Sequence, residues 1–90
     1  MYEVAAGVRS TRNADGGIVL DIDQGKIFRL NGIAALIFER LERRQTRAQI
    51  IEEISKEFEI STSTAETDVF EFLESLREQG LVQGSAEESS

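Results

Sequence analysis

The sequence predicts an α+β fold that is winged-helix-like, with an N-terminal three-stranded antiparallel β-sheet followed by three α-helices. Apolar side chains alternate with a period of two before residue 31 and recur at helical spacing after it. Helix-capping residues divide the second part into three segments. The 90 residues suit one small domain, which we place at 1–82, followed by a disordered tail at 83–90 that is rich in Gly, Ser and Glu.

The strands are expected in the first third of the chain. A weak strand is predicted over residues 7–12, and turn residues at 13–17 separate it from the alternating segment 18–23. A tight turn at 23–25 leads into the returning strand Lys26–Leu30, so the last two strands form a hairpin. The side chains expected to face the core from the alternating segment are Ile18, Leu20 and Ile22.

The two acids of this hairpin resemble the start of a calcium loop. Asp21, Asp23 and Gly25 have the initial spacing of that loop, which also requires Gly at its sixth position and Glu at its twelfth. This chain has Lys26 and Gly32 there instead. We therefore interpret the segment as a hairpin turn with two outward acids, and we expect neither a metal nor a cofactor.

Capping residues mark the beginnings of the helices. The signals are Asn31 before a helix at 32–44, the capping box Thr46–Gln49 before a helix ending near residue 58, and the capping box Ser63–Glu66 before a helix ending at residue 79. Apolar residues recur at i, i+3 and i+4 in each segment, which predicts one buried face per helix. We expect Gly80 to end the third helix in a left-handed conformation, with Leu81 folded back onto Leu76.

The composition makes an enzyme an unfavourable interpretation. The chain has no His and no Cys, so it lacks an imidazole base, a thiol nucleophile and the usual zinc ligands. Its apolar runs are too short to cross a membrane, and its first residues do not have the pattern of a signal peptide. We expect a cytoplasmic binding protein that contacts no membrane.

The charge distribution argues against nucleic acid as the partner. Ten basic and seventeen acidic residues give a net charge of -7. In a helix-turn-helix the second helix of the pair reads the major groove, and here that helix has five acids against Arg77 alone. A basic cluster lies earlier, and its members are Arg40, Arg43, Arg44 and Arg47. We interpret this cluster as charge compensation at a helix end, while a winged-helix DNA-binding regulator stays an alternative.

A strand and a helix face together outline a peptide-binding groove. If the strand Lys26–Leu30 is a sheet edge, its unpaired N–H and C=O groups can pair with an added strand. On the third helix a stripe runs beside the core position Val69, and it consists of Glu66, Phe70, Leu73 and Arg77. Phe70 is either partly exposed on this stripe or buried under a loop, and the sequence leaves both open.

Several segments of the chain together resemble the PqqD-like family. They are GIVLD at 17–21, GKIFRLN at 25–31, AALIF at 34–38, IIEEI at 50–54, DVFEFLESL at 68–76 and GLV at 80–82. No single motif is very specific, whereas their order and spacing are. The resemblance covers roughly residues 8–82, which is nearly the whole expected domain.

The resemblance implies a recognition element for ribosomally synthesised, post-translationally modified peptides (RiPPs). Such a domain binds the leader of a precursor peptide as an added strand between its third strand and third helix, and presents it to a modifying enzyme or leader peptidase. The residues expected to bind the peptide are Lys26, Ile27, Phe28, Arg29, Leu30, Glu66, Val69, Phe70, Leu73 and Arg77. A stand-alone chaperone of a lasso-type pathway is slightly favoured, and the alternative is PqqD proper, which carries the precursor of pyrroloquinoline quinone.

Overall fold

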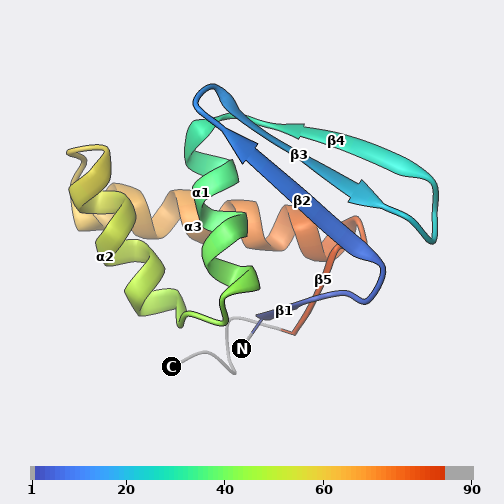
Figure 1. Ribbon diagram of the computed structural model, residues 1–90. Helices are drawn as coiled ribbons and strands as arrows, with labels where there is room; N and C mark the ends of the chain where they lie inside the picture. The colour runs from blue at the N-terminus through green and yellow to red at the C-terminus, as the bar shows by residue number, and fades with distance from the viewer. Residues whose placement is uncertain (1, 85–90) are drawn as a thin grey trace.

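The computed structural model describes residues 2–84 and confirms the α+β fold class (Figure 1). The elements are β1 (Tyr2–Val4), β2 (Val8–Asn13), β3 (Gly16–Asp21), β4 (Lys26–Leu30), α1 (Gly32–Glu42), α2 (Arg47–Glu57), α3 (Thr62–Glu78) and β5 (Val82–Gly84). Figure 1 shows α1 between α2 and the three-stranded sheet, with α3 crossing behind α1. The helices thus cover one face of the sheet and leave the other face open.

The three predicted strands form one antiparallel sheet in the order β2-β3-β4, so that β4 is an edge strand. The two short strands β1 and β5 were not predicted. They pair with each other in antiparallel fashion and bring the two ends of the described chain together. Because β5 continues to Gly84, the structured chain runs two residues past the predicted boundary at 82, and residues 85–90 of the predicted tail lie outside the described residues.

The prediction of which β3 side chains face the core is wrong. Val19 is fully buried and Asp21 is 3% exposed, whereas Ile18, Leu20 and Ile22 are the exposed set. Asp21 tolerates burial because its carboxylate accepts hydrogen bonds from the Gln24 backbone N–H at 3.1 Å and from Gln24 Nε2 at 2.7 Å. A satisfied acid therefore occupies the inner face, and the apolar residues that alternate with Val19 and Asp21 are turned outward.

Two of the three predicted helix caps are confirmed. The Asn31 side chain accepts a hydrogen bond from Ala34 N, and Thr46 and Gln49 form the reciprocal capping box. The third cap is Ser61, two residues before the predicted Ser63, and its hydroxyl accepts from Thr64 N at 3.1 Å. The helix therefore begins earlier, at Thr62, because Ser61 has the extended backbone that capping requires.

The end of α3 has the predicted glycine stop. Gly80 has a φ of 78°, and its N–H donates to the Arg77 carbonyl. The Leu81 N–H donates to the Leu76 carbonyl at 2.9 Å, which completes a Schellman motif. Leu76 and Leu81 are both buried in the core, so this ending directs the chain from α3 into β5.

Candidate functional site

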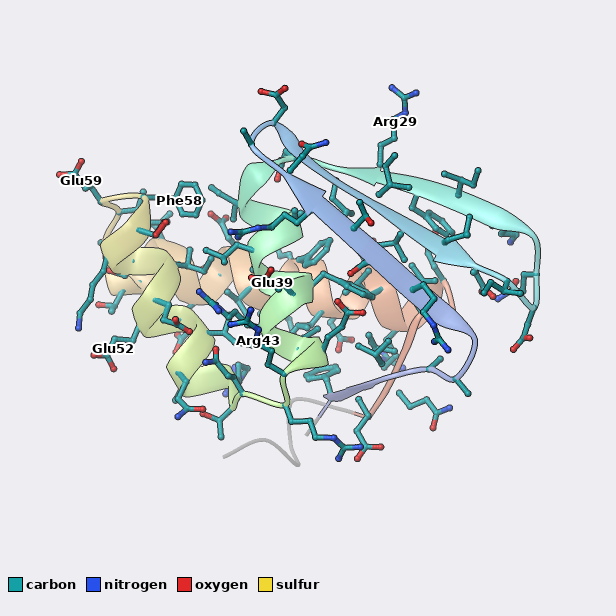
Figure 2. The ribbon with its side chains drawn as sticks, in the orientation of Figure 1. Arg29, Glu39, Arg43, Glu52, Phe58 and Glu59 are labelled. Carbon is teal, nitrogen blue, oxygen red and sulfur yellow. The ribbon has the colours of Figure 1, made fainter. Side chains whose placement is uncertain are left out.

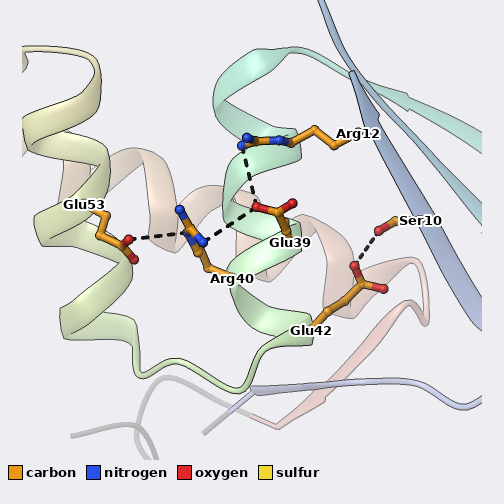
Figure 3. Close-up of polar contacts among 6 residues, drawn as sticks. All are labelled: Ser10, Arg12, Glu39, Arg40, Glu42 and Glu53. Atoms are coloured by element: carbon orange, nitrogen blue, oxygen red, sulfur yellow. Dashed lines mark hydrogen bonds and ion pairs between the residues drawn. The ribbon is translucent and has the colours of Figure 1, made fainter. Parts of the chain in front are cut away.

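The edge of β4 is the open edge of the three-stranded sheet. At the opposite edge, side chains of β2 contact α1. The Ser10 hydroxyl donates a hydrogen bond to the Glu42 carboxylate, and Arg12 Nη1 lies 3.8 Å from Glu39 Oε1 (Figure 3). Among residues 2–84, no side-chain hydrogen bond or ion pair covers β4. The backbone edge of β4 is therefore available to an added strand.

The register shows which backbone groups of β4 face outward. The N–H of Ile22 donates to the carbonyl of Gly7 at 2.9 Å, in line with the pairing of β2 and β3. Bonding alternates along an antiparallel strand, so Leu20 and Ile18 bond to β2, and the residues between them bond to β4. Their partners on β4 are Lys26, Phe28 and Leu30. The backbone N–H and C=O groups of Ile27 and Arg29 are thereby left for an added strand.

An apolar hollow lies where β4 passes into α1. It has a volume of about 400 Å³ and is lined by Asn31, Ile33, Ala34 and Ile37 from the start of α1 and by Asp68, Glu71 and Phe72 from α3. Ile33 and Phe72 of this lining are partly buried against the core, and so are Phe28 and Leu30 of the adjoining strand β4. The inner side chains of β4 and one flank of α3 thus offer partly accessible apolar surface beside the open edge.

The predicted stripe on α3 does not line this hollow. Val69 and Leu73 are fully buried, so their side chains have no surface left for a peptide. Phe70 is 41% exposed, which answers the question that the sequence left open, but it lies 200° around the helix from Phe72. Arg77, on the same flank as Phe70, bonds to Glu74 at 2.7 Å.

Sequence reasoning missed the α3 residues that do line the hollow, which are Asp68, Glu71 and Phe72. Helical spacing from Val69 puts Phe72 near the core face of α3, and Phe72 is partly buried against the core. The spacing could not reveal which flank of α3 faces the end of β4, because that depends on how α1 and α3 cross. Of the predicted helix residues, Glu66 is exposed and makes no contact with the hollow.

The other flank of α3 holds β1 in place. The Tyr2 hydroxyl donates to Glu74 at 2.7 Å, and Arg77 donates to the same carboxylate. Burial, followed by this hydrogen bond and the negative charge of Glu74, raises the pKa of Tyr2 to about 12. The hydrogen bond from Arg77, and then that from Tyr2, holds the pKa of Glu74 below its usual value. The three side chains are mutually satisfied, which indicates a structural role.

Comparison with known proteins gives the family of this chain. A family described as coenzyme PQQ synthesis protein D (PqqD) matches residues 16–82. The chain belongs to the PqqD family. The match confirms the resemblance found in the sequence. It spans the strands β3 and β4, the three helices and the first residue of β5. No curated protein matches the chain.

Two solved structures show how far the likeness of this PqqD-family chain extends. One is described as TbiB1 in complex with the TbiA(beta) leader peptide. It is 26% identical, has a TM-score of 0.85, and the match covers 93% of this chain and 98% of that one. The other is a lasso peptide synthetase B1 complexed with the leader peptide, with 26% identity, a TM-score of 0.81, and coverage of 92% and 98%.

The calcium-like turn and two members of the basic cluster, Arg40 and Arg44, make contacts within the described chain of this PqqD-family member. Asp21 is bonded within its turn, as described above, and no cluster of three or more acids within residues 2–84 could hold a metal ion. Arg40 Nη1 lies 3.7 Å from Glu39 Oε1, and Arg40 Nε lies 3.4 Å from Glu53 Oε1 (Figure 3). The second contact links α1 to α2. Arg44 lies 3.9 Å from Glu3 of β1. No helix in the described part of the chain is long and apolar enough to cross a membrane.

Proposed function

We propose that this chain binds the leader segment of a ribosomally made precursor peptide as a strand added to β4. It then presents the peptide to a modifying enzyme or leader peptidase. The observation that carries the proposal is the open edge of β4 beside an apolar hollow. The descriptions of both solved relatives support it, because each was solved with a leader peptide, and one of them is named for lasso peptide synthesis.

The added strand would pair with the backbone of Ile27 and Arg29, whose N–H and C=O groups face the open edge. Its side chains would alternate, so every second one would point toward the hollow. Apolar leader residues would pack there against Phe28, Leu30 and Phe72. Backbone pairing would supply affinity largely independent of sequence, and the hollow would select leaders with apolar residues at alternate positions.

The test is a titration of the leader peptide encoded beside the gene into isotopically labelled protein. We expect the amide signals of residues 26–30 and of the α3 flank around Phe72 to shift, because the peptide lies between them. Phe72→Ala should weaken leader binding roughly tenfold, as a truncated apolar anchor does. Phe70→Ala is the matched control, since Phe70 is on the opposite flank of α3.

The outcomes distinguish binding at the hollow from binding at the α3 stripe that the sequence predicts. Loss of binding in Phe70→Ala, with Phe72→Ala unaffected, would move the peptide to the flank of Glu66, Phe70 and Arg77. Unchanged amide signals throughout 26–30 would exclude pairing with β4. Circular dichroism of both variants controls for unfolding, because Phe72 also packs against the core.

Two pathways are compatible with the family. The solved relatives favour a lasso-type precursor, whereas the family description names coenzyme PQQ synthesis. Parallel titrations with a lasso precursor leader and with a pyrroloquinoline quinone precursor peptide would separate them. We expect the lasso-type leader to bind more tightly.

A further inference from the structure

The sheet face that points away from the helices carries an apolar patch. Ile18 is 42% exposed, Leu20 39% and Ile27 66%. Leu20 and Ile27 are directly paired in the register of β3 and β4, so their side chains are neighbours on the same face. Most large apolar side chains in this small domain are buried, so three clustered exposed ones on one sheet face require an explanation.

Two cations border this patch. Arg29 is paired with Ile18 on one side of β3, and Arg9 is paired with Leu20 on the other. Figure 2 shows Arg29 extending from β4 away from the helices. Within residues 2–84 neither guanidinium is in an ion pair, and the contact recorded for Arg9 is from Nη1 to the backbone carbonyl of its neighbour Val8. We call the set Ile18, Leu20, Ile27, Arg9 and Arg29 the outer face.

The charge of the outer face disfavours a second copy of this chain. In a twofold dimer through this face, the same patch meets itself, so the two bordering cations of one copy would lie against a patch with the same two cations and no bordering carboxylate from this set. Anionic membranes also bind surfaces that are apolar and basic, but the chain as a whole carries a charge of -7, which such a membrane repels. The complementary surface is an apolar protein patch bordered by carboxylates.

We propose that the outer face docks the enzyme that acts on the leader-bound peptide, through an apolar surface with acidic residues at its border. This inference rests on the proposed function for the identity of the partner. Ile27 and Arg29 direct their backbone groups to the open edge and their side chains to the outer face. An enzyme on this face would therefore sit beside the bound leader, with access to the peptide that continues from it.

The experiment uses the full chain, its precursor peptide and the leader peptidase encoded with them. The variants are Leu20→Glu, which places a charge in the middle of the patch, and Arg9→Glu, which reverses a bordering charge far from the leader edge. Arg43→Glu, at the C-terminal end of α1, makes the same change in net charge as Arg9→Glu and is the matched control. Surface plasmon resonance measures binding of the peptidase, and fluorescence anisotropy measures binding of the leader.

We expect both outer-face variants to weaken peptidase binding about tenfold or more, and to change leader affinity by less than about twofold. Arg43→Glu should match the wild type in both assays. If Leu20→Glu fails to fold, Leu20→Thr keeps the strand and removes apolar area. Unchanged peptidase binding by Arg9→Glu and by whichever Leu20 variant folds would overturn the proposal.

Two further measurements exclude the competing occupants. A wild-type dimer in analytical ultracentrifugation that Leu20→Glu dissociates would overturn the proposal in favour of self-association. Binding to phosphatidylglycerol vesicles that Arg9→Glu abolishes would overturn it in favour of a membrane. Failure of the proposed function has a different signature: the leader would not bind the wild type, while the peptidase binding that depends on the outer face would still be measured.

Discussion

The Tyr2 hydroxyl links β1 to α3 by a hydrogen bond. Tyr2 is 6% exposed, belongs to the core cluster and donates to Glu74 of α3. Tyr2→Phe keeps the buried ring and removes this hydrogen bond, so we expect a loss of about 1 kcal/mol in the free energy of unfolding. In a domain of this length that loss lowers the melting temperature by roughly 4–8 °C. Thermal unfolding followed by circular dichroism measures it, and an unchanged melting temperature would contradict the bond's contribution.

The raised pKa of Tyr2 also predicts how stability depends on pH. The folded protein holds the phenolic proton up to about pH 12, whereas the unfolded chain releases it near the ordinary value of 10.0. The folded state therefore binds more protons between these values, and the free energy of unfolding falls as pH rises through that window. Below pH 10 this contribution is fully present. Tyr2→Phe should remove this part of the pH dependence.

A spectroscopic titration isolates this group. Tyr2 is the only tyrosine in the sequence, so the ultraviolet absorbance of tyrosinate reports on it alone. We expect a midpoint near 12 in the folded protein and near 10 in denaturant. A folded midpoint near 10 would show that the Tyr2 hydroxyl is solvated and does not bond to Glu74.

Among the elements, β4 has the property that the proposed function requires, which is a backbone free on one side. Arg29→Pro tests it, because proline removes the outward N–H of Arg29 but leaves intact the bonds that β4 makes to β3 through Phe28 and Leu30. We expect this variant to fold and to bind the leader at least about tenfold more weakly. Arg29→Ala is the control: it removes the side chain, keeps the N–H, and should bind the leader as the wild type does.

Calorimetry of the leader with both variants gives the comparison. Equal affinities for Arg29→Pro and Arg29→Ala would show that the Arg29 N–H makes no bond to the leader. Weak binding by Arg29→Ala would show that the guanidinium contributes to leader binding, and only a further loss in Arg29→Pro would then be assigned to the N–H.

The elements themselves were largely predictable because their signals are local. Asn31 and the Thr46–Gln49 box each satisfy N–H groups within the following turn, so their spacing alone places two helix starts.

The faces of β3 depend instead on tertiary contacts. Period-two alternation fits either face, and the burial of Val19 and Asp21 depends on the packing of α1 and on the bonds from Gln24. The pairing of β1 with β5 is non-local, and strands of three residues have almost no pattern to read.

The strand half of the candidate site likewise follows from local signals, whereas the helix half depends on tertiary packing. The strand Lys26–Leu30 is a sheet edge, which is the condition that the sequence analysis set, because β2 pairs with the other side of β3. The helix half was assigned from angles around a single helix, which cannot say which flank meets β4. Phe72 and Phe70 are two positions apart, and the crossing of α1 and α3 brings the former to the hollow.

For the molecule as a whole, the charge distribution disfavours DNA binding at the helix that would read it. Glu66, Glu71 and Glu78 of α3 are all exposed, and Arg77 is occupied by Glu74. We expect no shift of duplex DNA even at low salt, where electrostatic binding is strongest. A shift that weakens steeply with added salt and disappears in Arg43→Glu would contradict this expectation.

The two ends of the described chain form a second small sheet that closes the domain. Val82 is 2% exposed and is paired with Val4, and the Ala5 N–H donates to the Leu81 carbonyl at 2.9 Å. A chain that ends after Leu81 loses β5, the partner of β1, and leaves Tyr2 and Val4 without their strand. A chain that ends after Gly84 keeps both strands. The two truncations therefore locate the C-terminal boundary of the domain.

We expect the chain that ends after Gly84 to melt at the temperature of the full-length protein. The chain that ends after Leu81 should lose about 1.5–3 kcal/mol from the buried Val82 side chain alone, with a lower melting temperature. Tyr2→Phe should then cost less in the shorter chain than in the full one, because β1 is no longer held and the two changes share a partner. Equal melting of both truncations would place the boundary at Leu81. A loss already present in the chain ending at Gly84 would show that residues 85–90 contribute to stability.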